Sequence, residues 1–257
     1  MSPPEKISAV LIALDEERNI GAALESLAWA DEVLVIDGGS RDNTIAECRT
    51  RGAKVIEHAF SNYVDQKNFA LDEASHNWVL SLDADERVTN ALTEEIQSMA
   101  LSGFQAQGYR IPRVSYYLGR FVRSTAWYPD HQLRLFDRRQ GRWQGQYVHE
   151  SVRINAEAGK LRGEILHYSY DSISDHASRL NRYSGLAAEQ MCDAGRRSSL
   201  FPALVFPPFV FLKNYVIKAG FTDGSVGFIV SVMNAYYVFL KYIKLWEMGN
   251  NRKRPNE

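Results

Sequence analysis

This chain of 257 residues has few cysteines, almost no net charge and no long hydrophobic run. Its two cysteines, Cys48 and Cys192, lie far apart and lack metal-ligand spacing, so we expect ordinary thiols in a reducing compartment. The net charge of −1 argues against a general nucleic-acid-binding protein, because such proteins carry a basic excess. Residues 1–6 lack the basic-then-apolar pattern of a signal peptide, so a cytoplasmic location is expected.

The C-terminal third contains two uncharged apolar runs, 200–212 and 228–240. Neither reaches the roughly 20 residues that a membrane-spanning helix needs. Aromatic residues within the runs and lysines at their borders fit helices that lie in the plane of a membrane surface. The alternative is a helical pair that packs on the core or in a homodimer interface. We therefore expect residues 171–257 to form a helical extension with apolar, amphipathic segments that associate with a membrane.

Strand and helix signals alternate in the first hundred residues. Short apolar runs predict strands over 8–14, 32–36, 53–57 and 78–82. Apolar residues at helical spacing predict helices over 19–27, 42–51, 63–74 and 89–101. This alternation indicates an α/β fold with a parallel, doubly wound sheet. Right-handed crossovers then place the carboxyl ends of its strands at one edge.

Residues 107–168 have a different composition. Short strand-like runs rich in Arg, Tyr and Trp occur there, at 108–111, 132–136, 147–154 and 164–168. We place them in the same domain as residues 1–106, so that this domain ends near residue 170. One long helix is predicted over 174–194, at the start of the C-terminal extension.

The predicted strand 78–82 ends abruptly in the acidic motif Asp83-Ala84-Asp85-Glu86. Ligands of open α/β sheets bind at the carboxyl ends of strands, and clustered carboxylates there need a cation or donor groups. Oxygen-rich sites suit Mg²⁺ or Mn²⁺, commonly shared with substrate phosphates. The motif therefore suggests a divalent metal that holds a diphosphate. The alternative is an acidic turn that caps the helix beginning near Thr89.

Polar motifs also follow the first two predicted strands. The first strand ends in Asp15-Glu16-Glu17, and the second ends in Asp37-Gly38-Gly39-Ser40. A nucleotide could lie across all three strand ends, with Asp37 accepting a hydrogen bond from a base and Gly38 allowing close backbone approach. Each motif alone could be an ordinary cap or turn. Their joint occurrence at strand ends favours a nucleotide site.

Together these motifs resemble family 2 glycosyltransferases of the GT-A fold, a Rossmann-like, mostly parallel architecture, over roughly residues 7–170. The matching segments are 12–17, 35–44, 66–68 and 82–86. A closer likeness to the bacterial lipopolysaccharide-core β-glucosyltransferase subgroup is carried by segments 128–136, 148–150, 167–170 and 220–224. Family members often carry Asn in place of Asp15, and two acids where this chain has Asp37-Gly38.

The resemblance implies an inverting transfer of a hexose, glucose in that subgroup, from a UDP-sugar to a hydroxyl of a lipid-linked or lipopolysaccharide-core glycan. It divides the domain into a nucleotide-binding half, 1–106, and an acceptor half, 107–170. Asp85 would be the main ligand of Mn²⁺ or Mg²⁺, and Asp83 would reach the ribose or the metal. The nucleotide would be bound by Ala13, Asp15, Glu17, Asp37, Gly38 and Lys67. The protein would work peripherally at the inner face of the cell membrane.

Inversion needs a base that deprotonates the acceptor hydroxyl. Glu150, which follows a Trp/Gly-rich stretch at 143–147, is the first candidate and Asp130 is the second. Alternatively, Glu150 forms a salt bridge with an arginine such as Arg134, and Asp130 only shapes a turn after Pro129. Arg134 is also a candidate diphosphate clamp, since guanidinium pairs well with phosphate oxygens, or else a surface arginine.

His149 and His167 could contact a metal or phosphate, or could be structural.

Two other functions are alternatives to glycosyl transfer. A sugar-nucleotide nucleotidyltransferase would carry a Gly-rich, basic loop after the first strand, where this chain has residues 15–18. A catalytically inactive, membrane-anchored nucleotide-sugar-binding protein is the third possibility, and the intact acids argue against it.

Overall fold

The computed structural model describes residues 3–145 and 150–251, and the chain divides into two compact units. The first unit comprises Met1–Val114 and Asp130–Tyr168. The second comprises Ser115–Pro129 and Ser169–Glu257. Residues 115–129, which the sequence analysis grouped with the acceptor half, therefore cluster with the C-terminal helices.

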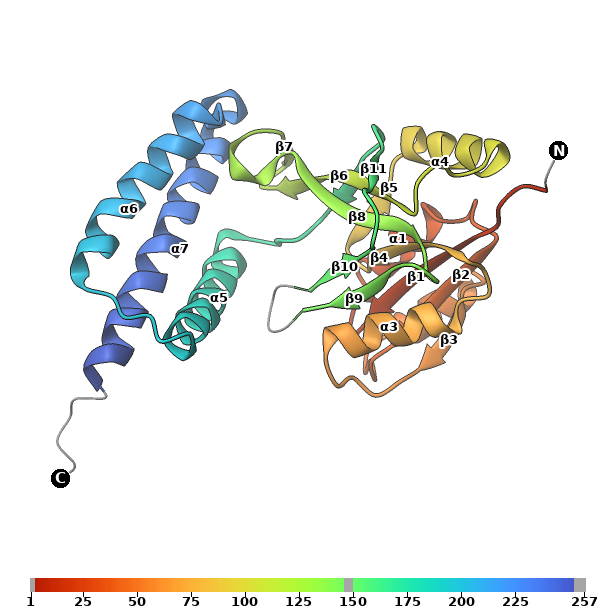
Figure 1. Cartoon of the computed structure of the whole chain (residues 1–257), viewed down its shortest axis with the longest axis horizontal. Helices are drawn as coiled ribbons and strands as arrows, with labels where there is room; N and C mark the ends of the chain where they lie inside the picture. The colour runs from red at the N-terminus through yellow and green to blue at the C-terminus, as the bar shows by residue number, and fades with distance from the viewer. Residues whose placement is uncertain (1–2, 146–149, 252–257) are drawn as a thin grey trace. The chain divides into compact units, whose positions relative to one another are not determined.

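Four parallel strands form one half of the sheet in the first unit (Figure 1). They are arranged in the order β3 (Lys54–Glu57), β2 (Glu32–Asp37), β1 (Ile7–Ala13) and β4 (Trp78–Asp83). In their register Ala13 pairs with Asp37, and Ile12 pairs with Asp83. The carboxyl ends of these strands thus share one edge, which confirms the predicted α/β architecture.

The other half of the sheet is mixed. β8 (Asp130–Asp137) joins antiparallel to β4 and is followed in order by β6 (Gly108–Tyr117), β12 (Ile165–His167) and β5 (Glu86–Val88). β7 (Arg120–Val122) and β11 (Gly159–Lys160) pair with β6 at its two ends. Strands β5, β7 and β11 were not predicted from the sequence, because strands of two or three residues show no alternation.

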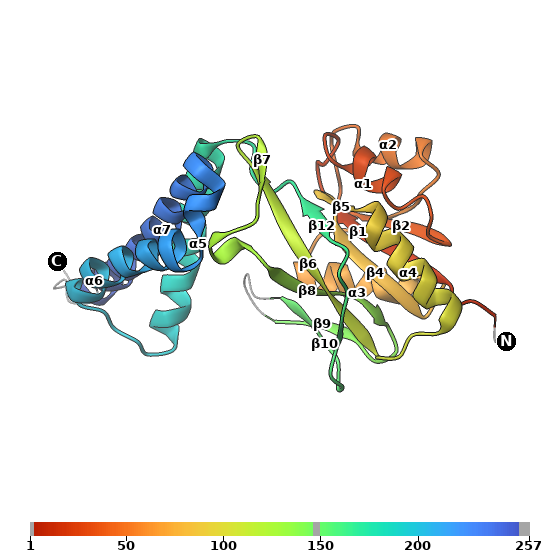
Figure 2. The ribbon, with the colours of Figure 1, turned by 90° about the horizontal axis from the view of Figure 1, so that it is seen from above.

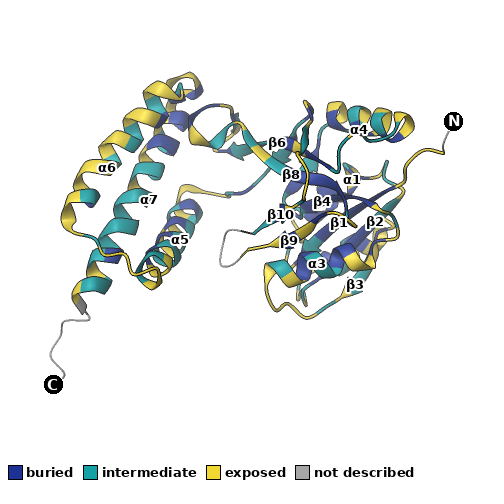
Figure 3. Cartoon of the chain, viewed as in Figure 1, coloured by how far each residue is buried: buried dark blue, intermediate teal, exposed yellow. Residues whose placement is uncertain are grey.

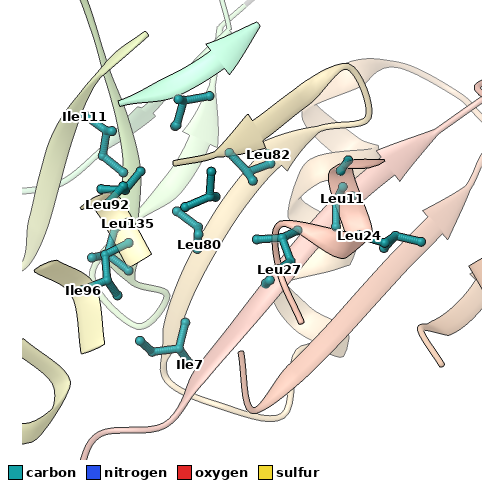
Figure 4. Packing of buried hydrophobic residues seen from close by; sticks show 14 of the residues in the cluster. Ile7, Leu11, Leu24, Leu27, Leu80, Leu82, Leu92, Ile96, Ile111 and Leu135 are labelled. Atoms are coloured by element: carbon teal, nitrogen blue, oxygen red, sulfur yellow. The ribbon is translucent and has the colours of Figure 1, made fainter. Parts of the chain in front are cut away.

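Helices cover both faces of the sheet, because the central strands are apolar on both sides. On one face α1 (Ile20–Glu25) and α4 (Asn90–Ser102) contribute Leu24, Leu92 and Ile96 to a cluster with Leu11 and Leu80 (Figure 4). On the other face α3 (Tyr63–Glu73) packs through Leu71 on Val10 and Val79. α2 (Thr44–Thr50) contributes the buried Cys48 to the first cluster.

A small separate ribbon of β9 (Arg142–Gln144) and β10 (Ser151–Arg153) packs against α3. The Asn68 side chain holds it by accepting a hydrogen bond from the Trp143 N–H and donating to the Trp143 carbonyl, both at 3.0 Å. Trp143 and Val152 pair across the ribbon and share one face of it. β10 lies within the strand predicted over 147–154, whereas residues 146–149 lie outside the described residues.

The second unit is mainly helical (Figure 2). α7 (Gly224–Asn251) packs against both α5 (Ile173–Asp193) and α6 (Leu200–Leu212). A π-helical turn, Lys213–Ile217, and a 3₁₀ turn, Gly220–Asp223, connect α6 to α7, and another 3₁₀ turn lies at Thr125–Trp127. The long helix expected over 174–194 is α5.

The two apolar helices are longer than their uncharged runs. Leu200–Ile217 and Gly220–Asn250 are each long and apolar enough to cross a membrane, by length and composition alone. The expectation that both segments are too short to span was therefore wrong, because the helices continue through lysines such as Lys213 and Lys241. Figure 3 shows exposed residues along much of α6.

Polar contacts hold α7 at two places within the second unit. Just before its first turn, the buried Asp223 accepts hydrogen bonds from the Ser124 hydroxyl at 2.6 Å and the Arg123 N–H at 2.9 Å. Asp223 also pairs with Arg120 at 3.1 Å. Farther along the helix, Lys244 donates to the Asn181 amide oxygen of α5 at 2.8 Å. These contacts fix α7 to polar segments of the same unit.

Candidate functional site

The loops after β1 and β2 brace each other at the carboxyl edge of the sheet. Asp15 accepts a hydrogen bond from the Arg41 N–H at 2.7 Å, and Glu17 accepts one from the Asn43 N–H at 3.1 Å. In return, the Glu16 N–H donates to the Thr44 hydroxyl at 2.8 Å. Asp15 has a φ of 56°, a left-handed conformation that Asp and Asn tolerate better than most residues. This explains why Asp can stand where family members often carry Asn.

Asp37 shapes the turn that follows β2. Its side chain is fully buried, and one carboxylate oxygen accepts hydrogen bonds from the N–H groups of Gly39 and Ser40, both at 2.8 Å. Gly38 donates its N–H to the Ala13 carbonyl at 2.8 Å. The predicted nucleotide residues Ala13, Asp37 and Gly38 are thus joined. Contact between Asp37 and a nucleotide remains a prediction. It would require the carboxylate to accept a hydrogen bond from the nucleotide in addition to those it accepts from the turn.

A buried ionic network lies beside the end of β4. Asp83 pairs with Lys67 of α3 at 2.9 Å and with Arg134 of β8 at 2.7 Å. Glu86, which is fully buried, pairs with Arg134 and with Arg113, each at 2.9 Å. Burial alone would raise the pKa of Asp83, but the charges of Arg134 and Lys67 hold it well below its usual range. Asp83 is therefore ionised at neutral pH.

Asp85, two residues after Asp83, faces His167. One Asp85 carboxylate oxygen is 3.3 Å from the His167 Nε2 atom. The pairing of β5 with β12 creates this contact, because Glu86 lies opposite His167 and the Tyr168 N–H donates to the Asp85 carbonyl at 2.9 Å. The role of His167 could not be predicted, since no local sequence pattern links two residues so far apart in the chain.

The residues at this edge fit a divalent cation that is shared with a ligand. In the part of the chain that the structure describes, no three His, Cys, Asp or Glu side chains form a complete metal site. Mg²⁺ commonly binds through one or two carboxylates together with substrate phosphates, and Mn²⁺ favours the same oxygen ligands. Asp85 and His167 could supply two ligands, and phosphate oxygens of a substrate could supply others.

The Arg134 guanidinium lies beside the Trp143 ring. Arg134 is 3% exposed, and only its Nη2 atom has partners among the described residues. The Trp143 ring lies 4.3 Å from the Lys67 ammonium group and 5.6 Å from the centre of the Arg134 guanidinium. Arg134 is thus not the surface arginine of the alternative interpretation. Trp143 was not selected as a site residue from sequence.

The two candidate bases have different surroundings. Glu150 is half-buried, and among the described residues its Oε2 atom is buried without a hydrogen-bond partner. Asp130 pairs with Arg113 at 2.6 Å and accepts a hydrogen bond from Gln132 at 2.6 Å. A base must be able to accept a proton, so these partners make Asp130 the less available of the two. His149 lies outside the described residues.

The chain belongs to glycosyl transferase family 2, whose model matches residues 8–156. It is 30% identical over 263 residues to the lipopolysaccharide core biosynthesis glycosyltransferase LpsC of Rhizobium meliloti, covering 100% of this chain and 97% of that protein. It is 33% identical over 258 residues to an uncharacterized glycosyltransferase of Rickettsia typhi, covering 95% of this chain and 88% of that protein. The predicted membership of this enzyme family is confirmed.

One solved structure similar to this chain is glucosyl-3-phosphoglycerate synthase from Mycobacterium tuberculosis, in complex with Mn²⁺, UDP and glucosyl-3-phosphoglycerate. The sequence identity is 25%, the TM-score is 0.37, and the match covers 45% of each chain. The match thus spans less than half the length of that protein.

Proposed function

We propose that this glycosyltransferase is inverting and metal-dependent, and that it moves a hexose, glucose by resemblance, from a UDP-sugar to a hydroxyl of a lipid-linked or lipopolysaccharide-core glycan. The observation that carries the proposal is the Asp85–His167 pair beside the ionised Asp83, at the edge where the β1 and β2 loops meet. The full-length similarity to a lipopolysaccharide core glycosyltransferase supports the acceptor class.

Each residue at this edge has a role in the proposal. Asp85 and His167 bind Mn²⁺ or Mg²⁺, and Asp83 orients the ribose or contributes to the metal site. Held by these residues, the ion would supply positive charge to offset the charge of the departing diphosphate. The UDP moiety is bound by the two braced loops and α3, through Ala13, Asp15, Glu17, Asp37, Gly38 and Lys67.

Glu150 is the proposed general base. Its unpartnered Oε2 atom can accept the proton of the acceptor hydroxyl as that oxygen attacks the anomeric carbon. Asp130 is the second candidate and would first have to loosen its pairing with Arg113.

Release of UDP tests the reaction class. We expect the purified protein with Mn²⁺ to release UDP from one UDP-hexose, and the rate to rise when a lipopolysaccharide-core acceptor is added. Formation of pyrophosphate from a sugar phosphate and UTP would instead identify a nucleotidyltransferase. UDP binding without release, across a panel of donors and acceptors, would identify an inactive binding protein.

We also propose that the second unit holds the protein at the inner face of the cell membrane. α6 exposes large apolar side chains, with Phe201 and Leu204 each 68% exposed, and Lys213 and Lys218 follow it. Because polar contacts at Asp223 and Lys244 fix α7 within its own unit, we favour helices that lie along the membrane rather than across it. A homodimer interface on the same surface is the alternative.

A further inference from the structure

Three hydrogen-bond donors lie together at the buried contact between Arg134 and Trp143. Arg134 and Trp143 are 3% and 5% exposed. Among the residues that the structure describes, the Nε and Nη1 atoms of Arg134 and the indole Nε1 of Trp143 have no hydrogen-bond partner. Buried polar groups in native proteins nearly always have partners, so this group of donors indicates the position of ligand oxygens.

An acceptor is expected on the same side of the β9–β10 ribbon. Trp143 pairs with Val152, and side chains alternate along a strand, so Glu150 is expected on the face that carries both. Its Oε2 atom is the buried acceptor described above. The ligand would therefore both accept hydrogen bonds, from Arg134 and Trp143, and donate one, to Glu150. A hydroxyl group does both.

The charge balance favours a neutral ligand. The adjoining network pairs three cations, Lys67, Arg113 and Arg134, with three carboxylates, Asp83, Glu86 and Asp130. Glu150 adds a further carboxylate. A phosphate would bring negative charge to a place where the cations are already paired, and uncompensated buried charge is costly.

We propose that Arg134 and Trp143 form a pyranose-binding subsite, in which the indole N–H and the free guanidinium N–H groups donate to sugar hydroxyl oxygens. This inference rests on the proposed glycosyltransferase reaction and adds to it the place where one of the two sugars binds. The sugar is either the hexose of the donor or the terminal sugar of the acceptor, which share this chemistry. Trp143 and Arg134 would then help to determine sugar specificity.

The substitution Trp143→Phe tests the subsite, because it removes the N–H group but keeps an aromatic ring against Lys67. For a donor subsite we expect binding of the UDP-hexose, measured by calorimetry with Mn²⁺, to weaken about three- to ten-fold, the effect of one lost hydrogen bond. UDP should bind as tightly as it does to the wild type. For an acceptor subsite, KM for the glycan should rise by a similar factor while both nucleotides bind normally.

Trp29→Phe is the matched control, because the Trp29 indole donates at 3.0 Å to the Ser26 carbonyl of its own turn. Equal weakening of UDP and UDP-hexose would overturn the proposal in favour of the diphosphate clamp predicted for Arg134. If Trp143→Phe changes neither the affinity for UDP or UDP-hexose nor the KM for the glycan, the proposal is overturned, and ordered water is the partner of the buried donors. If the wild type binds no UDP at all, the proposed function itself fails.

A second measurement does not depend on the stability of the variant. The protein has five tryptophans, so its indole N–H groups can give five resolved NMR signals. For a donor subsite, one indole signal should shift when UDP-hexose is added and stay in place when UDP is added. For an acceptor subsite, it should shift with the glycan. Identical indole spectra with UDP, UDP-hexose and glycan would contradict both.

Discussion

His176 is buried in an aromatic cluster of the second unit. Its ring stacks on Tyr170 with 4.2 Å between ring centroids, and its Nδ1 atom lies 3.0 Å from the Tyr117 hydroxyl. Burial lowers the pKa of His176 to about 4, with the nearby Arg179 acting in the same direction and Asp175 against it. His176 is therefore neutral in the folded protein at pH 6.

This lowered pKa predicts how stability depends on pH. Between about pH 6.5 and pH 4 the unfolded chain binds a proton at His176 that the folded protein does not. The stability contribution is thus present above pH 6.5 and is lost as the pH falls to 4, by about 3 kcal/mol. His176→Gln should show a smaller loss of unfolding free energy between pH 7 and pH 4.5 in urea titrations.

The exposed His131 provides the control for this measurement. His131→Gln should keep the wild-type pH dependence, because that side chain is in solvent in both states. If His176→Gln and the wild type lose the same stability between pH 7 and pH 4.5, the buried neutral histidine is not the cause.

At the scale of single elements, α6 has an unusual composition for a helix at the surface. It contains no charged residue, and seven of its large apolar side chains are exposed: Leu200, Phe201, Leu204, Val205, Phe206, Phe209 and Leu212. Contiguous apolar surface of this kind marks an interaction site in soluble proteins. It therefore supports a membrane or protein contact for the second unit.

Charged substitutions on α6 test the membrane proposal. Phe201 and Leu204 lie one turn apart on the same side, and both are largely exposed, so Phe201→Glu with Leu204→Glu should leave the fold intact. We expect at least about ten-fold weaker co-sedimentation with vesicles of anionic phospholipid, because each apolar side chain contributes about 1.5–3 kcal/mol when buried. Gln97→Glu with Ser98→Glu on the exposed face of α4 changes the net charge equally and should bind like the wild type.

Two outcomes would reject the membrane proposal for α6. One is a wild-type protein that does not sediment with vesicles. The other is a wild-type dimer, seen by size-exclusion chromatography, that the α6 substitutions convert to a monomer.

For the whole molecule, the parallel half of the sheet could be predicted because β1, β2 and β4 are mostly apolar runs with helices between them. The three-residue strands β5 and β9 could not be predicted, since neighbouring segments rather than their own sequences hold them. The acidic residues of the site could be predicted because they stand at the ends of apolar runs. Their partners were not, because the contacts of Asp83 with Arg134 and of Asp85 with His167 depend on tertiary structure.

The structural surroundings of the acidic residues also distinguish roles that could not be told apart from residue type alone. Asp37 ends β2 and Asp85 follows β4, yet the Asp37 carboxylate accepts hydrogen bonds from its own turn while that of Asp85 faces an imidazole. A cation is therefore expected at Asp85, and the loop conformation is expected to depend on Asp37.

UDP binding with and without Mn²⁺ is the measurement that tests the central claim most directly. By calorimetry, Mn²⁺ should strengthen UDP binding to the wild type at least about ten-fold, since an ion held by Asp85 and His167 would attract the diphosphate. Asp85→Ala and His167→Ala should each abolish this gain, whereas Glu94→Ala, at an exposed position of α4, should retain it. Two results would contradict the proposed metal–diphosphate site. One is a wild-type UDP affinity that is the same with and without Mn²⁺. The other is an Asp85→Ala variant that, with Mn²⁺ present, binds UDP as tightly as the wild type does.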